Sequence, residues 1–308
     1  MSTSSRVDWL LFLLMGFFWG SSYLFIKIGV DAGLQPLTLV TLRLAIGFLL
    51  LASVVVVARE RLPRDPRTYA KLVVLAILGV TLPFTLITWA ETRVVSSLAA
   101  VINGAVPLFV LPIAAALLPD EPLTRNRVIG LLVGFVGVAV LVGLDPGVLS
   151  GTSLLPVLAL LGSTLSYAAG GVWARRMLQG LRPMITAVFE IGFSLVIVAV
   201  LATLVEGPIA LPASRDALFA VAWLGVFGSG LAFLIFFRIL GRWGATRASL
   251  VAYLMPVVGL VLGVLVLSEP LDARLVVGTA LVVGGIALVN RRLDPSPLPL
   301  PQVAQEPS

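Results

Sequence analysis

Two charged residues, Arg43 and Glu190, lie deep inside apolar stretches of the chain. Each follows a proline, Pro36 or Pro183, by seven residues, and seven residues of helix correspond to a depth of roughly 10 Å. A charge at that depth in a membrane is costly unless it is partnered. Either residue could therefore recognise a charged substrate, and Glu190 could also carry a proton. The alternative for both is a buried hydrogen-bond node that joins helices, and the sequence leaves the two interpretations open.

The chain contains no cysteine and no histidine. Thiolate nucleophiles, disulfides, histidine-ligated metals and histidine proton relays are therefore excluded, and we expect no metal and no cofactor. A side-chain proton carrier inside the membrane would have to be an acid, and Glu190 is the only acid well inside a predicted span. We expect any proton-linked step to pass through Glu190, while facilitated diffusion or exchange stays open.

Hydroxyl, amide and aromatic side chains could line a mainly apolar site for small amphipathic ligands. Thr81, Thr85 and Thr88, for example, follow one another at helical spacing and form one stripe. Serine and threonine in membrane helices often bond only to their own backbone or to a neighbouring helix, so a structural role stays open for each hydroxyl. The candidate substrate-binding residues are Trp19, Ser22, Tyr23, Thr81, Thr85, Thr88, Asn103, Pro107, Ser163, Ser166, Tyr167, Ser229, Phe233, Tyr253 and Pro256.

Pro107 and Pro256 fall near the centres of two apolar stretches. A proline inside a helix leaves the carbonyl four residues earlier without its usual donor, here the carbonyls of Asn103 and Ala252. At membrane depth such a carbonyl is tolerated where protein or a wet cavity satisfies it. We expect the two prolines to present backbone acceptors to substrate; a packing kink without a ligand is the alternative.

The apolar stretches that contain these candidate residues make up most of the chain. Of its 308 residues 59% are apolar and 12% are charged, with a mean hydropathy of +1.10, whereas soluble domains have about 25% charged residues. Apolar runs of about twenty residues can each cross roughly 30 Å of hydrocarbon, so a water-soluble enzyme is excluded. We predict an all-α membrane protein with ten transmembrane helices, over Trp9–Val30, Pro36–Ala58, Ala70–Ala90, Val95–Leu118, Arg127–Gly143, Leu154–Trp173, Pro183–Val205, Leu218–Leu240, Ala245–Leu267 and Leu271–Val289.

Positive charges indicate the orientation of these helices. Sixteen of the 21 lysines and arginines fall on the side that holds both termini and four on the other side, with Arg43 inside a span. Cytoplasmic loops carry the excess of positive charge, so we expect both termini in the cytoplasm of a bacterial inner membrane. The net charge of +6 belongs to these loops, and no water-facing basic domain exists that could bind nucleic acid.

The chain contains an internal repeat. Glu121-Pro122-Leu123 recurs as Glu269-Pro270-Leu271 at an offset of 148, and Arg43 matches Glu190 at 147. We expect a cytoplasmic tail over 1–8, a first five-helix repeat over 9–143, a periplasmic linker over 144–153, a second repeat over 154–290 and a disordered proline-rich tail over 291–308. Because five is odd, the two repeats must be inverted, and inverted repeats are typical of secondary transporters.

The repeated motif resembles the ten-helix EamA-type branch of the drug/metabolite transporter superfamily. The resemblance rests on Trp19-Gly20-Ser21-Ser22-Tyr23, Lys27, Pro36, Arg43, Pro107, Glu121-Pro122-Leu123, Gly130 and Gly137, and on the second copy from Tyr167 through Pro256, Glu269 and Gly285. It implies two inverted repeats and, often, an exporter of amino acids or other small metabolites by alternating access at a central cavity. It identifies no particular substrate.

Two further patterns concern the fifth and tenth helices. Glu121 and Glu269 are expected to begin these helices and to complement their dipoles. Glycines give both helices a close-packing face, which could serve a monomer or a homodimer; they are Gly130, Gly134, Gly137, Gly278, Gly284 and Gly285.

Other classes of membrane protein fit the sequence less well. An intramembrane enzyme would need a metal-binding acid cluster or a nucleophile and base, and a pump would need a phosphate-binding loop. A flippase for lipid-linked metabolites stays open. We expect the partners to be a small-molecule substrate, the lipid bilayer and, as a further candidate, protons.

Overall fold

The computed structural model describes residues 6–118, 124–142, 154–243 and 251–290, and every regular element in these ranges is a helix. The first half contains α1 (Arg6–Asp31), α2 (Pro36–Val57), α3 (Pro66–Ala76), η1 (Ile77–Thr81), α4 (Leu82–Glu91), α5 (Ser96–Gly104), α6 (Val106–Leu117) and α7 (Arg125–Val142). The second half contains α9 (Leu154–Met177), α10 (Pro183–Val205), α11 (Arg215–Trp223), η2 (Leu224–Leu231), α12 (Ala232–Trp243), α14 (Val251–Leu267) and α15 (Ala273–Asn290).

The helices are long and apolar enough for a membrane. Within the described ranges, seven helices or runs of consecutive helices could cross a bilayer by length and composition: Arg6–Asp31, Pro36–Val57, Pro66–Glu91, Ser96–Leu117, Leu154–Met177, Pro183–Val205 and Arg215–Phe236. α14 and α15 are apolar but shorter. Large apolar side chains such as Val57, Leu204 and Leu265 are more than 70% exposed, which suits a surface that faces lipid. The predicted linker over 144–153, the tail over 291–308 and Glu121 lie outside the described residues.

Two long helical runs contain a π-helical segment that the sequence does not predict. η1 lies between α3 and α4, and η2 lies between α11 and α12. The two segments begin 147 residues apart, at Ile77 and Leu224, which is also the offset between Arg43 and Glu190. Single π-helical turns inside α-helices occur frequently at functional sites.

The predicted fourth helix is broken, so the expectation that Pro107 lies inside a continuous helix is wrong. α5 ends at Gly104 and α6 begins at Val106. The Ala105 N–H between them donates to the carbonyl oxygens of Asn103 and Ile102. Because proline has no N–H to donate, the chain breaks before it, and Pro107 falls in the first turn of α6, where the missing donor costs nothing. Pro256, in contrast, lies inside α14.

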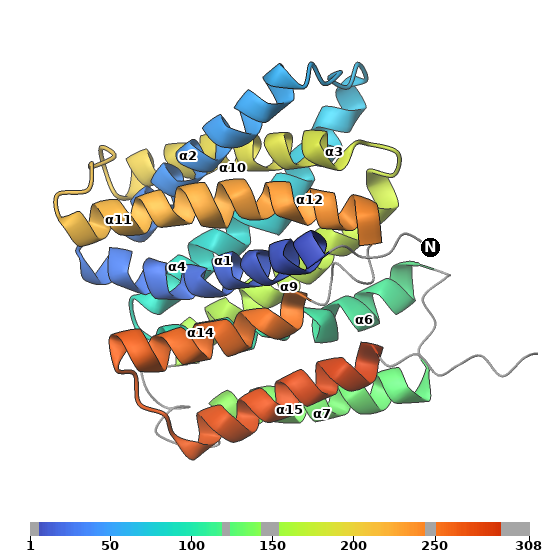
Figure 1. Ribbon diagram of the computed structural model, residues 1–308, viewed down its shortest axis with the longest axis vertical. Helices are drawn as coiled ribbons and strands as arrows, with labels where there is room; N and C mark the ends of the chain where they lie inside the picture. Colours follow the sequence, from blue (N-terminus) through green and yellow to red (C-terminus); the bar gives the residue numbers. More distant parts are fainter. Residues whose placement is uncertain (1–5, 119–123, 143–153, 244–250, 291–308) are drawn as a thin grey trace, which may run out of the picture.

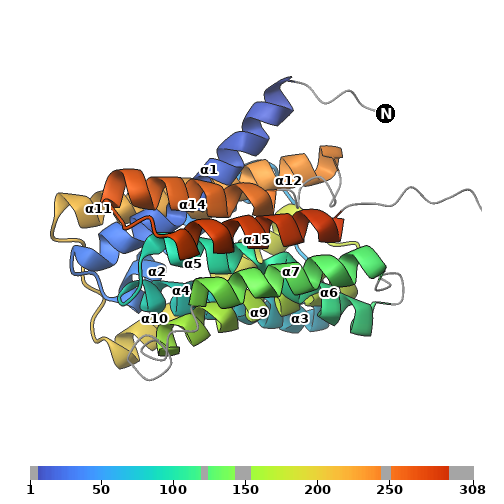
Figure 2. The ribbon, with the colours of Figure 1, turned by 90° about the horizontal axis from the view of Figure 1, so that it is seen from below.

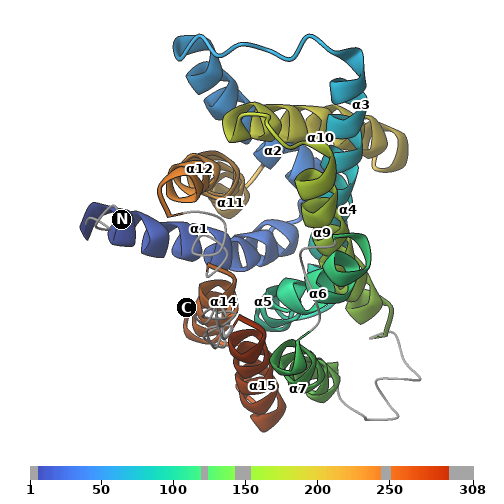
Figure 3. The same cartoon turned by 90° about the vertical axis from the view of Figure 1, so that its right-hand side faces the viewer.

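The helices form a bundle in which the two halves are interleaved. α2 and α10 lie at one edge, α7 and α15 lie side by side at the opposite edge, and α1, α11, α12 and α14 lie between them (Figures 1 and 3). The main buried apolar cluster joins side chains of both halves, for example Tyr23 and Ile102 with Leu160 and Leu224. The core therefore lies between the halves.

Close packing of α7 on α15 uses the predicted glycine face within one chain (Figure 2). A methyl group added to Gly130 would lie 2.6 Å from the Gly285 carbonyl oxygen, and one added to Gly137 would lie 2.7 Å from the Val282 nitrogen. Gly284 does not belong to this face, since a methyl group there would meet no atom within 4 Å. The glycines bring the two backbones together inside the monomer.

Candidate functional site

Arg43 is held at the boundary between the two halves. Its side chain is only 3% exposed, and its Nε donates a hydrogen bond to Ser229 Oγ of η2 at 3.2 Å. The guanidinium also lies over the ring of Phe84 in α4, 4.2 Å from the ring centroid, and such a cation–π contact is favourable when it is shielded from water. The positive charge from α2 is therefore stabilised by one residue of each half.

Several of the predicted site residues gather around Arg43 and Gly228. The Trp19 indole N–H donates to the Gly228 carbonyl oxygen at 3.2 Å, and the Trp19 ring meets Phe233 edge to face. A methyl group added to Gly228 would lie 2.9 Å from Ser22 Oγ and 3.2 Å from Arg43 Nη2. α1 and η2 thus form a wall of aromatic and hydroxyl groups beside the guanidinium.

Tyr23 and Tyr167 extend this arrangement. Both act electrostatically on Arg43, and both belong to or pack against the core between the halves. The structure therefore brings together around Arg43 six of the fifteen predicted binding residues, which are Trp19, Ser22, Tyr23, Tyr167, Ser229 and Phe233.

Glu190 lies against the other π-helical segment. A methyl group added to Gly79 of η1 would overlap Glu190 Oε1, and one added to Gly170 of α9 would lie 3.1 Å from the Gly79 nitrogen. Two hydroxyl groups of the second half bond to carbonyls here: Ser166 Oγ donates to Leu78 O at 2.7 Å, and Ser194 Oγ donates to Ala76 O at 3.0 Å. The second half thus surrounds η1 with polar groups.

The two intramembrane charges therefore have reciprocal positions. Arg43 of the first half contacts η2 of the second, and Glu190 of the second half lies against η1 of the first. Each charge faces the π-helical segment of the opposite half rather than the other charge. Each charged side chain therefore contacts the segment in which the α-helix of the opposite half changes to a π-helix.

Other predicted site residues form hydrogen bonds within the protein, away from Arg43. Ser163 Oγ donates to Asn103 Oδ1 at 2.8 Å, and Asn103 Nδ2 donates to Ala99 O at 3.2 Å, which links α9 to α5. Thr85 Oγ1 donates to Thr81 O of its own helix at 2.7 Å, and Tyr253 donates to Ile286 O of α15 at 2.7 Å. The Ser163–Asn103 and Tyr253–Ile286 contacts join helices, whereas the Thr85 contact stays within one helical run.

Pro256 packs against the end of α5. A methyl group added to Gly104 would lie 2.9 Å from Pro256 Cγ, and Gly104 stands three residues before Pro107. α14 therefore crosses α5 where the fourth helical run breaks.

Three buried or partly buried acids have roles that the sequence does not indicate. Glu269 accepts the N–H groups of Ser96 and Ser97 at 2.6 and 3.0 Å. The prediction that Glu269 complements the tenth helix is therefore wrong: it caps α5, while α15 begins only at Ala273. Sequence patterns cannot show this contact, because the two partners lie more than 170 residues apart.

Glu206 and Glu91 are the other two acids. Glu206 accepts the N–H groups of Leu37 and Thr38 at 2.7 and 2.8 Å, so it caps α2 from the end of α10. Glu91 is the last residue of α4 and is 0% exposed. The predicted third helix stops one residue before Glu91, at Ala90. Glu190 is therefore not the only acid inside the helix bundle.

The outer surface is apolar, and the charges of Arg43 and Glu190 lie between the two halves. These features define a polytopic integral membrane protein with a polar centre, the class to which solute transporters belong. The model of the EamA-like transporter family matches residues 8–143 and again residues 154–291. The chain therefore belongs to the EamA-like transporter family, and each half matches the same family model.

Relatives agree with this assignment, and a solved structure shares the fold. The chain is 31% identical over 276 residues to the "Uncharacterized inner membrane transporter YedA" of Escherichia coli strain K12, covering 88% of this chain and 87% of that protein. It is 26% identical over 298 residues to the "Probable amino-acid metabolite efflux pump" of Salmonella typhimurium strain LT2, covering 92% and 94%. A crystal structure at 23% identity has the same fold, with a TM-score of 0.66 over 92% of this chain and 96% of that chain.

Proposed function

We propose that this membrane transporter is a secondary exporter of small carboxylate-bearing metabolites such as amino acids. The observation that carries the proposal is the buried guanidinium of Arg43 at the boundary between the halves. Membership of the EamA-like family supports transport, and the name of the Salmonella relative supports amino-acid metabolites as the substrate class.

The chemistry around Arg43 favours an anionic group attached to an apolar body. A guanidinium presents five N–H donors in a planar fork that matches a carboxylate in two-point geometry. Trp19, Tyr23 and Phe233 supply aromatic surface beside it. Arg43 would bind the carboxylate, and the aromatic rings would contact the apolar part of the substrate.

Transport would proceed by alternating access between two inverted five-helix repeats. In this proposal the chain crosses the inner membrane ten times with both termini in the cytoplasm, and the ends of α1, α4, α10 and α14 face the periplasm. Glu206 and Glu269 then join the halves on the periplasmic side. Opening to the periplasm would separate these acids from the helix ends that they cap.

Glu190 is our candidate for a proton-linked step. Its carboxylate lies against Gly79, so a change in its charge would act directly on η1. Facilitated diffusion or exchange would need no such step, and the protein would then retain transport when Glu190 cannot titrate.

The test is counterflow into proteoliposomes with a labelled panel of amino acids, their uncharged amides, sugars, nucleosides and lipid-linked sugars. We expect transport of a carboxylate compound but not of its amide, and at least a tenfold loss in Arg43→Gln with partial recovery in Arg43→Lys. Arg215→Gln, at the exposed start of α11, is the matched control. Undiminished carboxylate transport by Arg43→Gln would refute the proposed role, and transport of the lipid-linked compounds alone would indicate a flippase.

A further inference from the structure

Five buried oxygen atoms without a hydrogen-bond partner occur at the end of α4 and the start of α5. They are Thr88 Oγ1, both carboxylate oxygens of Glu91, and the hydroxyl oxygens of Ser96 and Ser97. Across the part of the chain that the structure describes, only two other buried side-chain polar atoms lack a partner. All four residues are 0% exposed. Because buried polar atoms are normally paired, this concentration points to a ligand.

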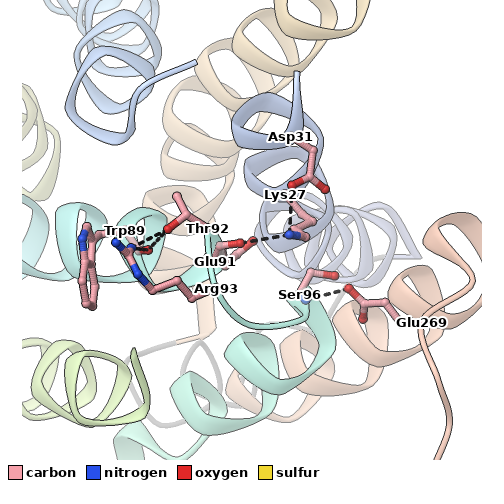
Figure 4. A network of polar contacts seen from close by, with 8 residues as sticks. All are labelled: Lys27, Asp31, Trp89, Glu91, Thr92, Arg93, Ser96 and Glu269. Carbon is pink, nitrogen blue, oxygen red and sulfur yellow. Dashed lines mark hydrogen bonds and ion pairs between the residues drawn. The ribbon is translucent and has the colours of Figure 1, made fainter. Parts of the chain in front are cut away.

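These residues share one region of the fold. Thr88 and Glu91 are three residues apart on α4 and so lie on the same face of the helix. Ser96 follows after a short turn, and Glu269 of the opposite half contacts its N–H (Figure 4). A methyl group added to Gly263 of α14 would lie 3.1 Å from Ser96 Oγ and would overlap Glu269 Oε2. The start of α5, next to the end of α4, therefore lies against α14 and Glu269.

The charges around Glu91 do not balance. The groups that act electrostatically on its carboxylate are Glu269, Lys27, Arg43 and Asp31. The Lys27 ammonium donates to Asp31 Oδ1 at 2.9 Å and to the backbone oxygen of Glu91 at 3.2 Å (Figure 4), whereas neither oxygen of the Glu91 carboxylate has a hydrogen-bond partner.

The remaining neighbours of Glu91 are also engaged. Glu269 is compensated by the N-terminus of α5, which carries about half a positive charge, and Arg43 is held by Ser229 and Phe84. One negative charge, that of Glu91, is left without a bonded counter-charge.

We propose that Glu91 binds one monovalent cation, either Na⁺ or a proton, with Thr88, Ser96 and Ser97 as supporting oxygen ligands. A single uncompensated carboxylate balances a single positive charge. Hard cations are bound by carboxylate, carbonyl and hydroxyl oxygens, whereas among the described residues no group of three His, Cys, Asp or Glu could hold a metal ion. A proton would satisfy the carboxylate alone, and Na⁺ would also use the hydroxyl oxygens.

The cation would be linked to the site around Arg43. Glu91 acts electrostatically on both Arg43 and Tyr23, so neutralising Glu91 leaves the positive charge of Arg43 freer to attract an anion. This linkage rests on the proposed function, whereas cation binding itself does not. Binding can therefore be tested without substrate and without transport.

The first arm of the test uses the purified full-length protein in detergent. Thermal unfolding is measured as NaCl replaces choline chloride at constant ionic strength, for the wild type, Glu91→Gln, Ser97→Ala and Asp216→Asn. Asp216 is an exposed acid in the first turn of α11 and serves as the control. If Na⁺ is the ligand, the midpoint rises saturably in the wild type and in Asp216→Asn, rises only at higher Na⁺ in Ser97→Ala, and does not respond in Glu91→Gln.

The second arm detects a proton by infrared difference spectroscopy during a pH titration. If a proton is the ligand, the wild type shows a protonated-carboxyl band that disappears as the pH rises and that is absent from Glu91→Gln. Should Glu91→Gln fail to fold, Glu91→Asp takes its place, because it retains the acid with a shifted position and is expected to shift the Na⁺ or pH midpoint. A wild type without a saturable Na⁺ response and without a titrating band, or a Na⁺ response that persists in Glu91→Gln, overturns the proposal.

Discussion

Two adjacent glycines of α15, Gly284 and Gly285, should respond in opposite ways to the same substitution. A methyl group on Gly285 would lie 2.6 Å from the Gly134 nitrogen and 2.7 Å from the Gly130 oxygen. Favourable contacts between such atoms lie at about 3.5 Å, so α7 and α15 would have to separate by roughly 1 Å. On Gly284 the methyl group would meet no atom within 4 Å.

The magnitude follows from two opposing contributions. Overpacking of a close contact costs about 1–3 kcal/mol, and alanine in place of glycine gains up to about 1 kcal/mol of helix propensity. Because both variants share the propensity gain, Gly285→Ala should be less stable than Gly284→Ala by about 1–3 kcal/mol, and Gly284→Ala should equal the wild type or exceed it by up to about 1 kcal/mol. Each kcal/mol corresponds to roughly 2–4 °C in the unfolding midpoint for chains of about 200 residues.

The assay is thermal unfolding of the two purified variants in the same detergent, followed by intrinsic tryptophan fluorescence. We expect Gly285→Ala to unfold several degrees below Gly284→Ala. Two variants with equal midpoints, or a lower midpoint for Gly284→Ala, would refute the packing of α7 on α15 through Gly285. Gly130→Ala tests the same contact from the other helix, since its methyl group would meet the backbone of α15.

Three further predictions follow from the acids and from the proposed orientation. Glu190→Gln in proteoliposomes should retain substrate exchange and lose accumulation driven by a pH gradient; accumulation at the wild-type level would leave Glu190 as a structural node. Glu206→Gln removes the negative charge that accepts two N–H groups of α2, so it should lower stability by about 1–2 kcal/mol, and a midpoint within one degree of wild type, taking roughly 2–4 °C per kcal/mol, contradicts that role. Alkaline phosphatase fused after Arg292 should be inactive, because the carboxyl terminus is expected in the cytoplasm; an active fusion contradicts the ten-span orientation.

Local sequence patterns predict most of the described helical ranges, although the predicted fourth helix is broken. Apolar runs separated by prolines and charges, such as the run that begins at Pro36 and the one that begins at Pro183, coincide with α2 and α10. The same patterns do not predict η1 and η2, and in the structure side chains of distant helices bond to carbonyls in and beside η1. Ser166 and Ser194 supply these bonds for η1, and nothing in the sequence near Ile77 indicates them.

The sequence predicts candidate-site residues most directly where a charged residue lies deep inside an apolar stretch. Arg43 and Glu190 were identified because they interrupt apolar stretches, but their opposite partners, Ser229 and Gly79, depend on how the two halves fold together. Glu91 directly follows the predicted third span, which ends at Ala90, so the sequence does not indicate that it is buried. In the folded chain it is fully buried and contacts Lys27 of α1 (Figure 4), and sequence spacing does not contain that information.

The reciprocal contacts of Arg43 and Glu190 limit how the two halves could ever be recombined. Both halves match one family model, which is what a duplicated ancestral gene leaves behind. In the same arrangement, a chain assembled from two first halves would bury an arginine against both π-helical segments, and a chain assembled from two second halves would bury a carboxylate against both. The two copies carry opposite charges at one matched position, so in this chain each half supplies a different charge to the π-helical segment of the other.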